Sequence, residues 1–573
     1  MQPIDSTNKV IRRHFMRRAW HLLKPYFTSE ERWSALLLLV ATLFMNAAVV
    51  GVQVYLTNWN GRFYNALQQY NISAFPRLVV TFFIGLAFFI ALVMLGYYFQ
   101  SLLQLRWRRW LTYAFSSKWI NHSRYYQLEL NSQYADNPDQ RITEDIDNLT
   151  NLSLSLFIGL FGSVISLVSY LIMLWHLSGS LDFTLFGYNI SIPHYMIVVA
   201  FVYSMLANWL AHLVGRKLIS INYYKEKVEA NLRFGLIRLR ENGRAIAQMK
   251  GEEVEKAQIA DRFKDIWYAT RALITYTKRL TGYSTGVLNL GNVFPLFAAA
   301  PQYFTKQITL GTLMQTSSAF TNVQSALSWF VNSYQDLTSW RAVIERLDNF
   351  NLALDELPEP LQRPGQTHES SENTRPELND LELALPQGTS MLSIDELILN
   401  KGEHTLIEAP SGSGKSLLFG VMAGNWPFWQ GRVRMPTSAF FVPQTPYLPI
   451  GTLSEVLAYP GEVQTYQHEQ LEDALRSVGL PHLVNELDER AHWERRLSPG
   501  EKQRISFARV LLKKPEWLFM DEATAALDLP AEQALYQLLI ERLPETTIVS
   551  IAHKNTLAHF HPRTVTLKGH RQD

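Results

Sequence analysis

Cysteine is absent from this chain of 573 residues, and its acidic and basic residues almost cancel. The absence of cysteine excludes structural disulfides and cysteine-ligated metals, although it leaves the cellular compartment open. A formal net charge of +2 gives no large electrostatic field, so charge does not indicate a nucleic-acid partner. No cleavable signal peptide and no short-period repeat are recognisable. The length exceeds that of one compact core, and at least two domains are expected.

Long uncharged stretches fill much of the first half of the chain. Residues 33–57 carry no charge and are long enough to cross a bilayer. Five further apolar runs follow, of which the last two are weaker: 78–105, 153–177, 193–215, 283–304 and 310–335. A single run of this kind fits a buried core helix equally well. The whole set predicts a membrane domain of six spans.

The distribution of basic residues predicts the orientation of this domain. Lysine and arginine concentrate after the second and fourth runs, whereas the segment between the third and fourth carries Asp182 as its only charge. By the positive-inside rule, both basic segments (about 106–150 and 216–280) and both chain ends are expected in the cytoplasm. The two segments are polar and helix-favouring, which predicts long extensions of the spanning helices. Residues 1–32 are expected to form a cytoplasmic amphipathic segment.

Composition changes after the last apolar run. Residues 351–378 are rich in Pro, Glu, Ser and Thr and lack apolar periodicity, which predicts a linker. The preceding residues 33–350 are therefore expected to form the transmembrane domain. In residues 379–573 short apolar strands alternate with turn signals and helical patterns, as in an α/β domain.

A glycine-rich loop lies between a predicted strand that ends at Glu408 and a predicted helix. Strand, loop and helix are the context of a P-loop, whose backbone N–H groups and helix N-terminus hold phosphates. Lys415 is predicted to reach the β- and γ-phosphates and Ser416 to bind Mg²⁺. Ala409 stands where the first glycine is usual, and the loop alone is also compatible with a chance linker. The candidate phosphate-binding residues are Ser411, Gly412, Ser413, Gly414, Lys415, Ser416 and Leu417.

Three further predicted strands end in polar side chains. The apolar strand that ends at Met520 is followed by Asp521, a predicted Mg²⁺ ligand, and Glu522, a predicted general base for the attacking water. Ligands of open α/β sheets bind at such strand ends. Gln444 is a further candidate Mg²⁺ ligand, and His553 a candidate catalytic contact to the γ-phosphate. Taken alone, each of these last two equally fits an ordinary surface or structural side chain.

In this order, the motifs resemble the nucleotide-binding domain of ATP-binding cassette (ABC) transporters. Gln444 matches the Q-loop, residues 497–503 the signature sequence, Asp521 and Glu522 Walker B, and His553 the switch histidine. The resemblance implies binding and hydrolysis of ATP with Mg²⁺. It also implies the exporter-type fold: an α-helical membrane domain of six spans with long cytoplasmic extensions, followed by an α/β P-loop nucleotide-binding domain.

The signature sequence is the part of the resemblance that implies an oligomeric state. In the family, half-transporters work as dimers, and the resemblance implies that Ser498, Gly500 and Glu501 complete the ATP site of the other subunit of a homodimer. Pro499 replaces the common glycine of this motif. Residues 384–386 read Ala-Leu-Pro where many members stack an aromatic side chain on adenine, so adenine is expected to be held by apolar contact.

The membrane half narrows the resemblance through segments 58–68, 136–146 and 229–252. They resemble the subfamily that joins peroxisomal fatty-acyl half-transporters to bacterial SbmA/BacA-like proteins, and within it the YddA-type fusions of such a membrane domain to an ATPase. This implies an ATP-driven transporter of peptides or other hydrophilic solutes such as cobalamin, in a bacterial inner membrane and in contact with its lipid. Fatty acids, acyl-CoA or lipids are the alternative cargo, and a membrane-anchored ATPase or an ATP-gated channel is the alternative class.

Polar side chains within the predicted spans have two readings. They either line a transport route or form hydrogen bonds between helices. The candidates are Asn46, Gln53, Asn208, Asn289 and Asn292. No acidic residue occurs inside a predicted span, so ATP rather than a proton gradient is the expected source of energy.

Overall fold

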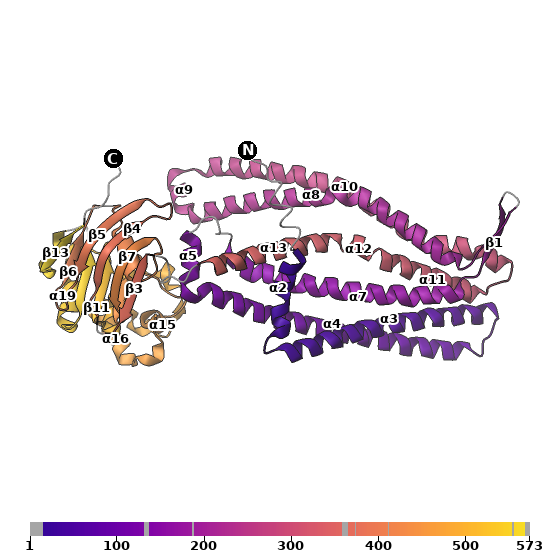
Figure 1. The fold of residues 1–573 in the computed structure, drawn as a ribbon, viewed down its shortest axis with the longest axis horizontal. Coiled ribbons are helices and arrows are strands. Elements are labelled where there is room, and N and C mark those ends of the chain that lie inside the picture. The colour runs from indigo at the N-terminus through magenta and orange to yellow at the C-terminus, as the bar shows by residue number, and fades with distance from the viewer. Residues whose placement is uncertain are drawn as a thin grey trace. The chain divides into compact units, whose positions relative to one another are not determined.

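The computed structural model describes seven stretches of the chain: residues 15–130, 137–185, 188–357, 365–372, 374–410, 412–552 and 555–567. Contacts group the residues into two compact units. One unit comprises Met1–Phe115 with Asn137–Phe350, and the other comprises Ser116–Asp136 with Asn351–Asp573. We refer to them as the membrane unit and the ATPase unit, after the two domains expected from the sequence (Figure 1).

Long helices form the membrane unit. In chain order they are α2 (Phe15–Thr28), α3 (Arg32–Gln68), α4 (Phe75–Ile120), α7 (Ile146–Leu177), α8 (Tyr195–Glu241), α10 (Glu252–Phe304), α11 (Leu310–Leu327) and α13 (Tyr334–Glu356). Among the described residues, the helices that contain α3, α4, α7 and α8 are long and apolar enough to cross a membrane. Helices α10 and α11 occupy the two weaker apolar runs. The positions of the six predicted spans therefore agree with the helices of the structure.

Shorter elements connect these helices. They are η1 (Asn121–Ser123), α5 (Arg124–Leu130), α6 (Pro138–Gln140), the π-helix η2 (Arg141–Asp145), the hairpin of β1 (Leu181–Leu185) and β2 (Tyr188–Ile192), α9 (Gly243–Met249) and α12 (Trp329–Asn332). Helices α8 and α10 run beside each other on either side of α9 (Figure 1). The predicted helical extensions of the spans are thus present in the segments 106–120 and 216–280.

Packing in the membrane unit combines an apolar cluster with close helix contacts. The cluster joins α7, α8 and α11 and includes the buried side chains of Tyr170, Leu174, Ala200, Phe320 and Val323. Helices α3 and α11 approach so closely that a Cβ atom on Gly311 would lie 2.0 Å from the carbonyl oxygen of Gly61. Asn65 Oδ1 accepts the N–H of Gly311 at 2.9 Å, and Gln68 Oε1 accepts that of Leu310 at 2.9 Å. Side chains of α3 thereby cap α11.

Buried charge anchors the π-helix η2 inside the membrane unit. Asp145 is 2% exposed and is paired with Arg141, also buried. Its carboxylate also accepts a two-pronged contact from Arg346 of α13, with Nε to Oδ2 at 2.9 Å and Nη2 to Oδ1 at 2.5 Å. Two guanidinium groups therefore compensate one buried carboxylate, which is the condition under which burial of charge is tolerated. The segment was predicted as a polar extension, and this internal ion cluster was not.

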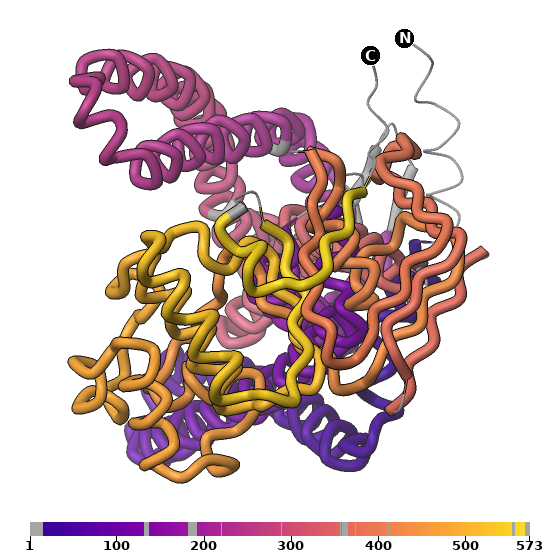
Figure 2. The backbone as a smooth tube through the Cα atoms, turned by 90° about the vertical axis from the view of Figure 1, so that its left-hand side faces the viewer, coloured from indigo at the N-terminus to yellow at the C-terminus, as the bar shows by residue number. Residues whose placement is uncertain are grey.

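Two large sheets build the ATPase unit, beside the short pair of β9 (Gly451–Thr452) and β10 (Arg490–Ala491). A parallel sheet has the order β13-β6-β12-β11-β8, with β13 (Arg563–Thr566), β6 (Thr405–Glu408), β12 (Thr547–Ile551), β11 (Trp517–Asp521) and β8 (Ala439–Val442). The second sheet has the order β3-β7-β4-β5, with β3 (Gln366–Ser371), β7 (Trp429–Pro436), β4 (Glu377–Ala384) and β5 (Ser390–Ile398). Figure 2 shows the yellow C-terminal strands beside the orange strands from earlier in the chain.

Helices and short segments complete the ATPase unit. They are α14 (Lys415–Met422), β9 (Gly451–Thr452), α15 (Leu453–Ala458), η3 (Val463–Thr465), α16 (His468–Ser477), η4 (Pro481–Glu486), β10 (Arg490–Ala491), α17 (Trp493–Arg496), α18 (Pro499–Lys513), α19 (Leu529–Arg542) and η5 (Asn555–Phe560). The three inner strands β6, β12 and β11 are almost wholly buried, because side chains of the helices and of the second sheet pack against them. Their continuous apolar sequences suit such a position.

The range predicted as a linker contains regular structure. Helix α13 continues to Glu356, and β3 pairs in parallel with β7 from Gln366↔Gly431 to Ser371↔Pro436. Residues 358–364 and 373 lie outside the described residues. The polar composition of β3 fits a strand at the edge of its sheet, where most side chains stay exposed. The polar composition therefore reflects the exposure of these residues, and the pairing of their backbone with β7 makes the segment a strand.

Helix α5 of the first basic segment belongs to the ATPase unit. The chain turns between α4 and α5 at His122 and Ser123, both with positive φ. Tyr126 and Leu130 then pack against the apolar core of the ATPase unit. A segment that lies far from the ATPase domain in sequence is thereby part of the same compact body.

Candidate active site

The carboxyl ends of four neighbouring strands carry the candidate residues. In the parallel sheet β6, β12, β11 and β8 lie side by side in that order, so their carboxyl ends meet at one edge. Strand β6 leads into the glycine-rich loop, β11 into Asp521 and Glu522, and β8 towards Gln444. Motifs that lie between residues 409 and 522 are thus gathered where ligands of open α/β sheets bind.

The glycine-rich loop has the backbone of a phosphate cradle. Gly412 and Gly414 have φ of 77° and 90°, a region that only glycine enters without strain. Helix α14 begins directly after Gly414, and no side chain caps its N-terminus in the described part of the chain. Ser413 Oγ is buried and has no hydrogen-bond partner among the described residues. The uncapped helix N-terminus and the unbonded hydroxyl of Ser413 fit an anionic ligand such as a phosphate.

Six of the seven candidate phosphate-binding residues can be located. Ser411 lies outside the described residues, and the others form the loop and the first turn of α14: Gly412, Ser413, Gly414, Lys415, Ser416 and Leu417. Gly412 and Ser416 are exposed, whereas Ser413 and Lys415 are buried. The exposed hydroxyl of Ser416 is therefore accessible to a ligand at the mouth of the loop.

Lys415 is held in the loop by its own backbone. Its Nζ donates to the carbonyl oxygen of Ala409 at 2.8 Å. Burial lowers the pKa of Lys415, and the nearby carboxylates of Glu522, Asp521 and Glu408 oppose this shift. The ammonium group of Lys415 therefore lies within electrostatic reach of Asp521 and of Glu522, which follows β11. A phosphate bound at the loop would add the negative charge that offsets the cost of burying this cation.

Glu522 occupies a strained position at the end of β11. Its φ of 45° lies in the left-handed region, which costs a non-glycine residue about 1–2 kcal/mol. The backbone N–H of Glu522 donates to Ile551 O of the neighbouring strand at 3.0 Å, and this bond holds the turn. Gln444 Nε2 donates to Glu522 Oε2 at 2.9 Å. The structure therefore brings together two residues predicted separately, and strain of this kind gathers at functional sites.

Oxygen ligands suited to Mg²⁺ converge at the same edge. Asp521, Ser416 and Gln444 offer a carboxylate, a hydroxyl and an amide oxygen, all of them hard ligands of the kind that Mg²⁺ prefers. In the part of the chain that the structure describes, no group of three or more His, Cys, Asp or Glu side chains is arranged to hold a metal. A site with one carboxylate fits Mg²⁺, which is commonly bound by one or two carboxylates together with substrate phosphates.

Glu532 is a neighbour of the site that the sequence did not reveal. His553 lies outside the described residues, but the segments around it are tied to β11 through this buried carboxylate. Glu532 accepts from Thr524 Oγ1 at 2.7 Å and from Thr556 Oγ1 at 2.9 Å. The two threonines follow Glu522 and His553 respectively. The only sequence signal was an acid in the first turn of a helix, which an ordinary helix end explains equally well.

The signature segment forms the N-terminus of α18. Ser498 Oγ accepts the N–H of Glu501 at 3.3 Å, and Glu501 Oε2 accepts the N–H of Ser498 at 2.8 Å, which together make a capping box. The bond from the Ser498 backbone lowers the pKa of Glu501. Pro499 at the first helical position has the φ that a helix requires. Glu501 is thus engaged in capping, while Ser498 and Pro499 remain exposed.

Helix α18 and the glycine-rich loop are packed in different parts of the ATPase unit. Helix α18 packs on α15, α16 and α19, whereas α14 packs on β7 and β11. Gln503 Oε1 accepts the N–H of Ala526 at 2.9 Å and so connects α18 to the turn after Glu522. Beside the loop, Leu383 and Met391 would each lie 3.5 Å from a Cβ on Gly414. Apolar side chains therefore flank the loop close in sequence to residues 384–386, where apolar contact to adenine was expected in place of an aromatic residue.

Comparisons with known proteins agree with this architecture. Residues 22–304 match the family described as ABC transporter transmembrane region 2, and residues 392–525 match the family described as ABC transporter. An uncharacterized ABC transporter ATP-binding protein of Haemophilus influenzae is 33% identical over 96% of this chain and 92% of its own length. The chain belongs to the ABC transporters. With one transmembrane region and one ATPase domain it is a half-transporter, and it couples ATP hydrolysis to transport across a membrane.

Two further relatives and one solved structure refine the comparison. The inner membrane ABC transporter ATP-binding protein YddA of Escherichia coli is 31% identical over 93% of this chain and 94% of its own length. The lysosomal cobalamin transporter ABCD4 of Homo sapiens is 25% identical over 97% and 95%. The structure of a bacterial Atm1-family ABC exporter with ATP bound matches with a TM-score of 0.74 at 16% identity and covers 94% of each chain. These matches confirm the predicted exporter-type fold.

Proposed function

We propose that the protein works as a homodimer in which each ATP lies between the P-loop of one subunit and the signature segment of the other. One observation carries this proposal. Ser498 and Pro499 are exposed at the N-terminus of α18, a helix packed apart from α14 and the P-loop. An exposed helix N-terminus attracts phosphate, and a second copy would bring it to the P-loop.

Each predicted residue has a role in the proposed site. Residues 411–417 hold the phosphates, with Lys415 as the buried cation. Ser416, Gln444 and Asp521 would hold Mg²⁺, which would supply positive charge to neutralise the bound phosphates. Glu522 accepts the proton of the attacking water. Gln444 keeps the Glu522 carboxylate in place, because its Nε2 donates a hydrogen bond to Glu522 Oε2 at 2.9 Å. His553 holds the water and Glu522 in position.

The signature residues act across the dimer. Ser498 and the N–H groups beyond Pro499 stabilise the phosphates of the partner's nucleotide, while Glu501 orients Ser498 through the capping box. The bond between Gln503 and Ala526 links this helix to the turn after Glu522. Binding of ATP therefore closes the two ATPase domains on each other, and hydrolysis lets them separate.

Mixed dimers test the composite site. Lys415→Ala and Ser498→Ala each destroy both sites of a homodimer, but a mixed dimer retains one site that lacks both changes. Co-expression with two different affinity tags and tandem purification isolates the mixed dimer. We expect it to recover ATPase activity that both parent homodimers lack. A mixed dimer as inactive as its parents, shown by native mass spectrometry to be the intended species, would refute the shared site.

The proposed cargo is a hydrophilic solute, either a peptide or a cobalamin-like molecule. Thr285, Asn289 and Asn292 are exposed and spaced by four and three residues, so they share one face of α10 within an apolar run. Polar faces of this kind in membrane helices commonly border a water-filled route. The name of the human relative, a lysosomal cobalamin transporter, supports the same class of solute. The name of the Escherichia coli relative supports an inner-membrane location.

Transport in sealed proteoliposomes tests the cargo. Cobalamin, a peptide mixture and an acyl-CoA are supplied separately, with ATP on the side of the ATPase domain. We expect ATP-dependent movement of cobalamin or peptide, and loss of that movement in Asn289→Leu/Asn292→Leu with ATP hydrolysis retained. If acyl-CoA is the only compound that moves, the proposed hydrophilic cargo is wrong and the cargo is an acyl-CoA or a lipid. Flux that persists in Glu522→Gln would indicate an ATP-gated channel.

A further inference from the structure

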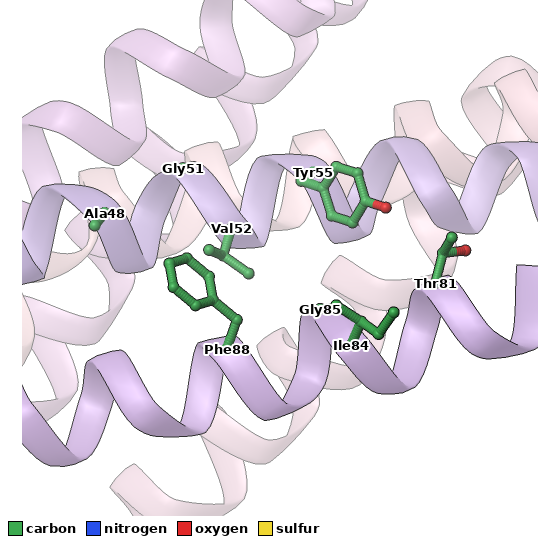
Figure 3. Close-up of a pocket in the computed structure, with 8 residues that line it drawn as sticks. All are labelled: Ala48, Gly51, Val52, Tyr55, Thr81, Ile84, Gly85 and Phe88. Carbon is green, nitrogen blue, oxygen red and sulfur yellow. The ribbon is translucent and has the colours of Figure 1, made fainter.

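An apolar groove separates the first two spanning helices. It is lined from α3 by Ala48, Gly51 and Val52, and from α4 by Gly85 and Phe88 (Figure 3). Its volume of about 460 Å³ falls within the roughly 300–1,000 Å³ typical of ligand pockets. Gly51 leaves this space open, whereas Gly85 lets α4 come close to α3, because a Cβ on Gly85 would lie 3.3 Å from Leu56 Cδ2. A Cβ on Gly51 would meet no atom within 4 Å.

The lining is apolar even where the residue type is polar. Thr81 Oγ1 donates to the carbonyl oxygens of Arg77 and Leu78 in its own helix, both at 2.9 Å, which satisfies the hydroxyl within the helix. Tyr55 contributes its ring to the end of the groove nearest the α3–α4 connection (Figure 3). A flexible hydrocarbon chain is the ligand that such a lining accepts, since it needs no hydrogen bonds.

Positive charge lies at this same end. The guanidinium carbon of Arg62 is 5.7 Å from the centre of the Tyr55 ring, a cation–π distance. Arg62 is two helical turns beyond Tyr55 on α3, and Arg77 is one turn beyond Thr81 on α4. Both arginines are exposed. The two cations therefore flank the mouth of an apolar groove.

No acidic residue of α3, α4 or α11 neutralises these cations. The sequence contains no Asp or Glu between Glu31 and Glu129, and α11, which packs on α3, contains none either. The α3–α4 connection lies on the side away from the cytoplasm, where the positive-inside rule disfavours Lys and Arg. Two uncompensated arginines at this position therefore complement a negatively charged group.

We propose that this groove binds an anionic phospholipid of the outer leaflet, with one acyl chain between α3 and α4 and the phosphate at Arg62 and Arg77. The groove lies within the apolar runs, so a chain reaches it from the bilayer itself. The phosphate of the same lipid sits at the membrane surface, where the arginines lie. The site is independent of the ATP site and of the transported solute.

Photolabelling tests the site in the full-length protein. The protein is reconstituted in nanodiscs with phosphatidylglycerol that carries a diazirine near the end of one acyl chain, and labelled peptides are mapped by mass spectrometry. We expect labelling concentrated in residues 48–55 and 81–88 above that of the exposed apolar face of α8. Equal labelling of α8 and the groove would overturn the proposal.

Matched variants separate the groove from general lipid contact. Gly51→Leu fills the groove without a clash, and Gly286→Leu places the same side chain at an exposed position of α10 that is equally free of neighbours. We expect a severalfold loss of groove labelling in Gly51→Leu only. Similar labelling in both variants contradicts the site. If Gly51→Leu instead lowers the dimer fraction in native mass spectrometry, the occupant is a second copy of the chain and the lipid assignment is wrong.

A third experiment tests whether the two arginines bind the lipid headgroup, and it also tests the proposal if Gly51→Leu folds poorly. Arg62→Gln/Arg77→Gln changes two exposed side chains. We expect it to reduce the preference for phosphatidylglycerol over phosphatidylcholine about tenfold or more. An unchanged preference refutes the role of the arginines. Competition of the groove label by excess cobalamin or peptide would assign the groove to the transport route and overturn the lipid site.

Discussion

Replacement of Glu522 by glutamine isolates the chemical step of ATP hydrolysis. Glutamine has nearly the same shape, so the turn at φ of 45° and the bond from its N–H to Ile551 O at 3.0 Å are retained. Its amide oxygen can still accept from Gln444, 2.9 Å away. The substitution therefore removes the basic carboxylate and leaves the surrounding geometry intact. ATP binding through the P-loop should remain.

The expected loss follows from what a general base contributes. A positioned base accelerates proton transfer by about 10²–10⁴-fold, which corresponds to roughly 3–5 kcal/mol of activation free energy. We therefore expect the ATPase rate of Glu522→Gln to fall by about 10²–10⁴-fold. Thermal stability should change little, because the side chain is only partly buried and keeps its partner.

Steady-state release of phosphate by the protein in nanodiscs measures the rate of hydrolysis. Binding of a fluorescent ATP analogue measures whether the variant still binds nucleotide. Glu516→Gln makes the same substitution immediately before β11, where Glu516 pairs with Lys401 at 3.4 Å on the surface. We expect that control to keep the wild-type rate. A rate for Glu522→Gln within about threefold of wild type, above the background of Lys415→Ala, would refute the assignment of Glu522 as the base.

Three further predictions concern packing and charge. Gly311→Ala forces a Cβ to within 2.0 Å of Gly61 O, so thermal unfolding in detergent should show a loss of about 1–3 kcal/mol that Gly286→Ala does not share. Arg346→Leu leaves the Asp145 carboxylate with one buried counter-ion, and chemical denaturation should show a loss of roughly 2–3 kcal/mol, less than for a fully buried pair because Arg346 is partly exposed. Burial lowers the pKa of His561 from 6.5, so the unfolded chain binds more protons below pH 6.5 and the ATPase unit should lose stability as the pH falls from there towards the lowered value. A melting temperature that falls as much in His561→Gln as in wild type between pH 7.5 and 5.5 would contradict this last prediction.

The spans and the ATP motifs were predictable because each depends on neighbours in the sequence. A run such as residues 33–57 carries its own evidence of a membrane helix in its length and lack of charge. Lys415 and Glu522 lie in motifs whose spacing follows from a turn at the end of a strand. Their convergence was also predictable, because parallel strands place their carboxyl ends at one edge of a sheet.

Residues that act through distant partners could not be found in this way. Glu532 is an acid in the first turn of α19, and only the fold shows that it joins Thr524 to Thr556. Asn65 and Gln68 belong to a segment whose resemblance to a family was visible, but their capping of α11 spans more than 240 residues. Such roles are properties of packing, and no local pattern encodes them.

The position of α5 gives the ATPase unit a physical connection to the spanning helices. Tyr126 and Leu130 pack on the core that also contains Phe419 of α14 and Phe519 of β11. The Phe419 and Phe519 rings lie 5.5 Å apart, so one continuous apolar core reaches the helix after the P-loop and the strand before Glu522. Helix α4 leads from its apolar run to η1 and α5, and Lys118 near its end bonds to Asn351 Oδ1 at 2.7 Å and to Asp355 at 2.6 Å. Packed cores transmit displacement rather than absorb it, so we expect any shift of the P-loop to be passed to α5 and to the end of α4.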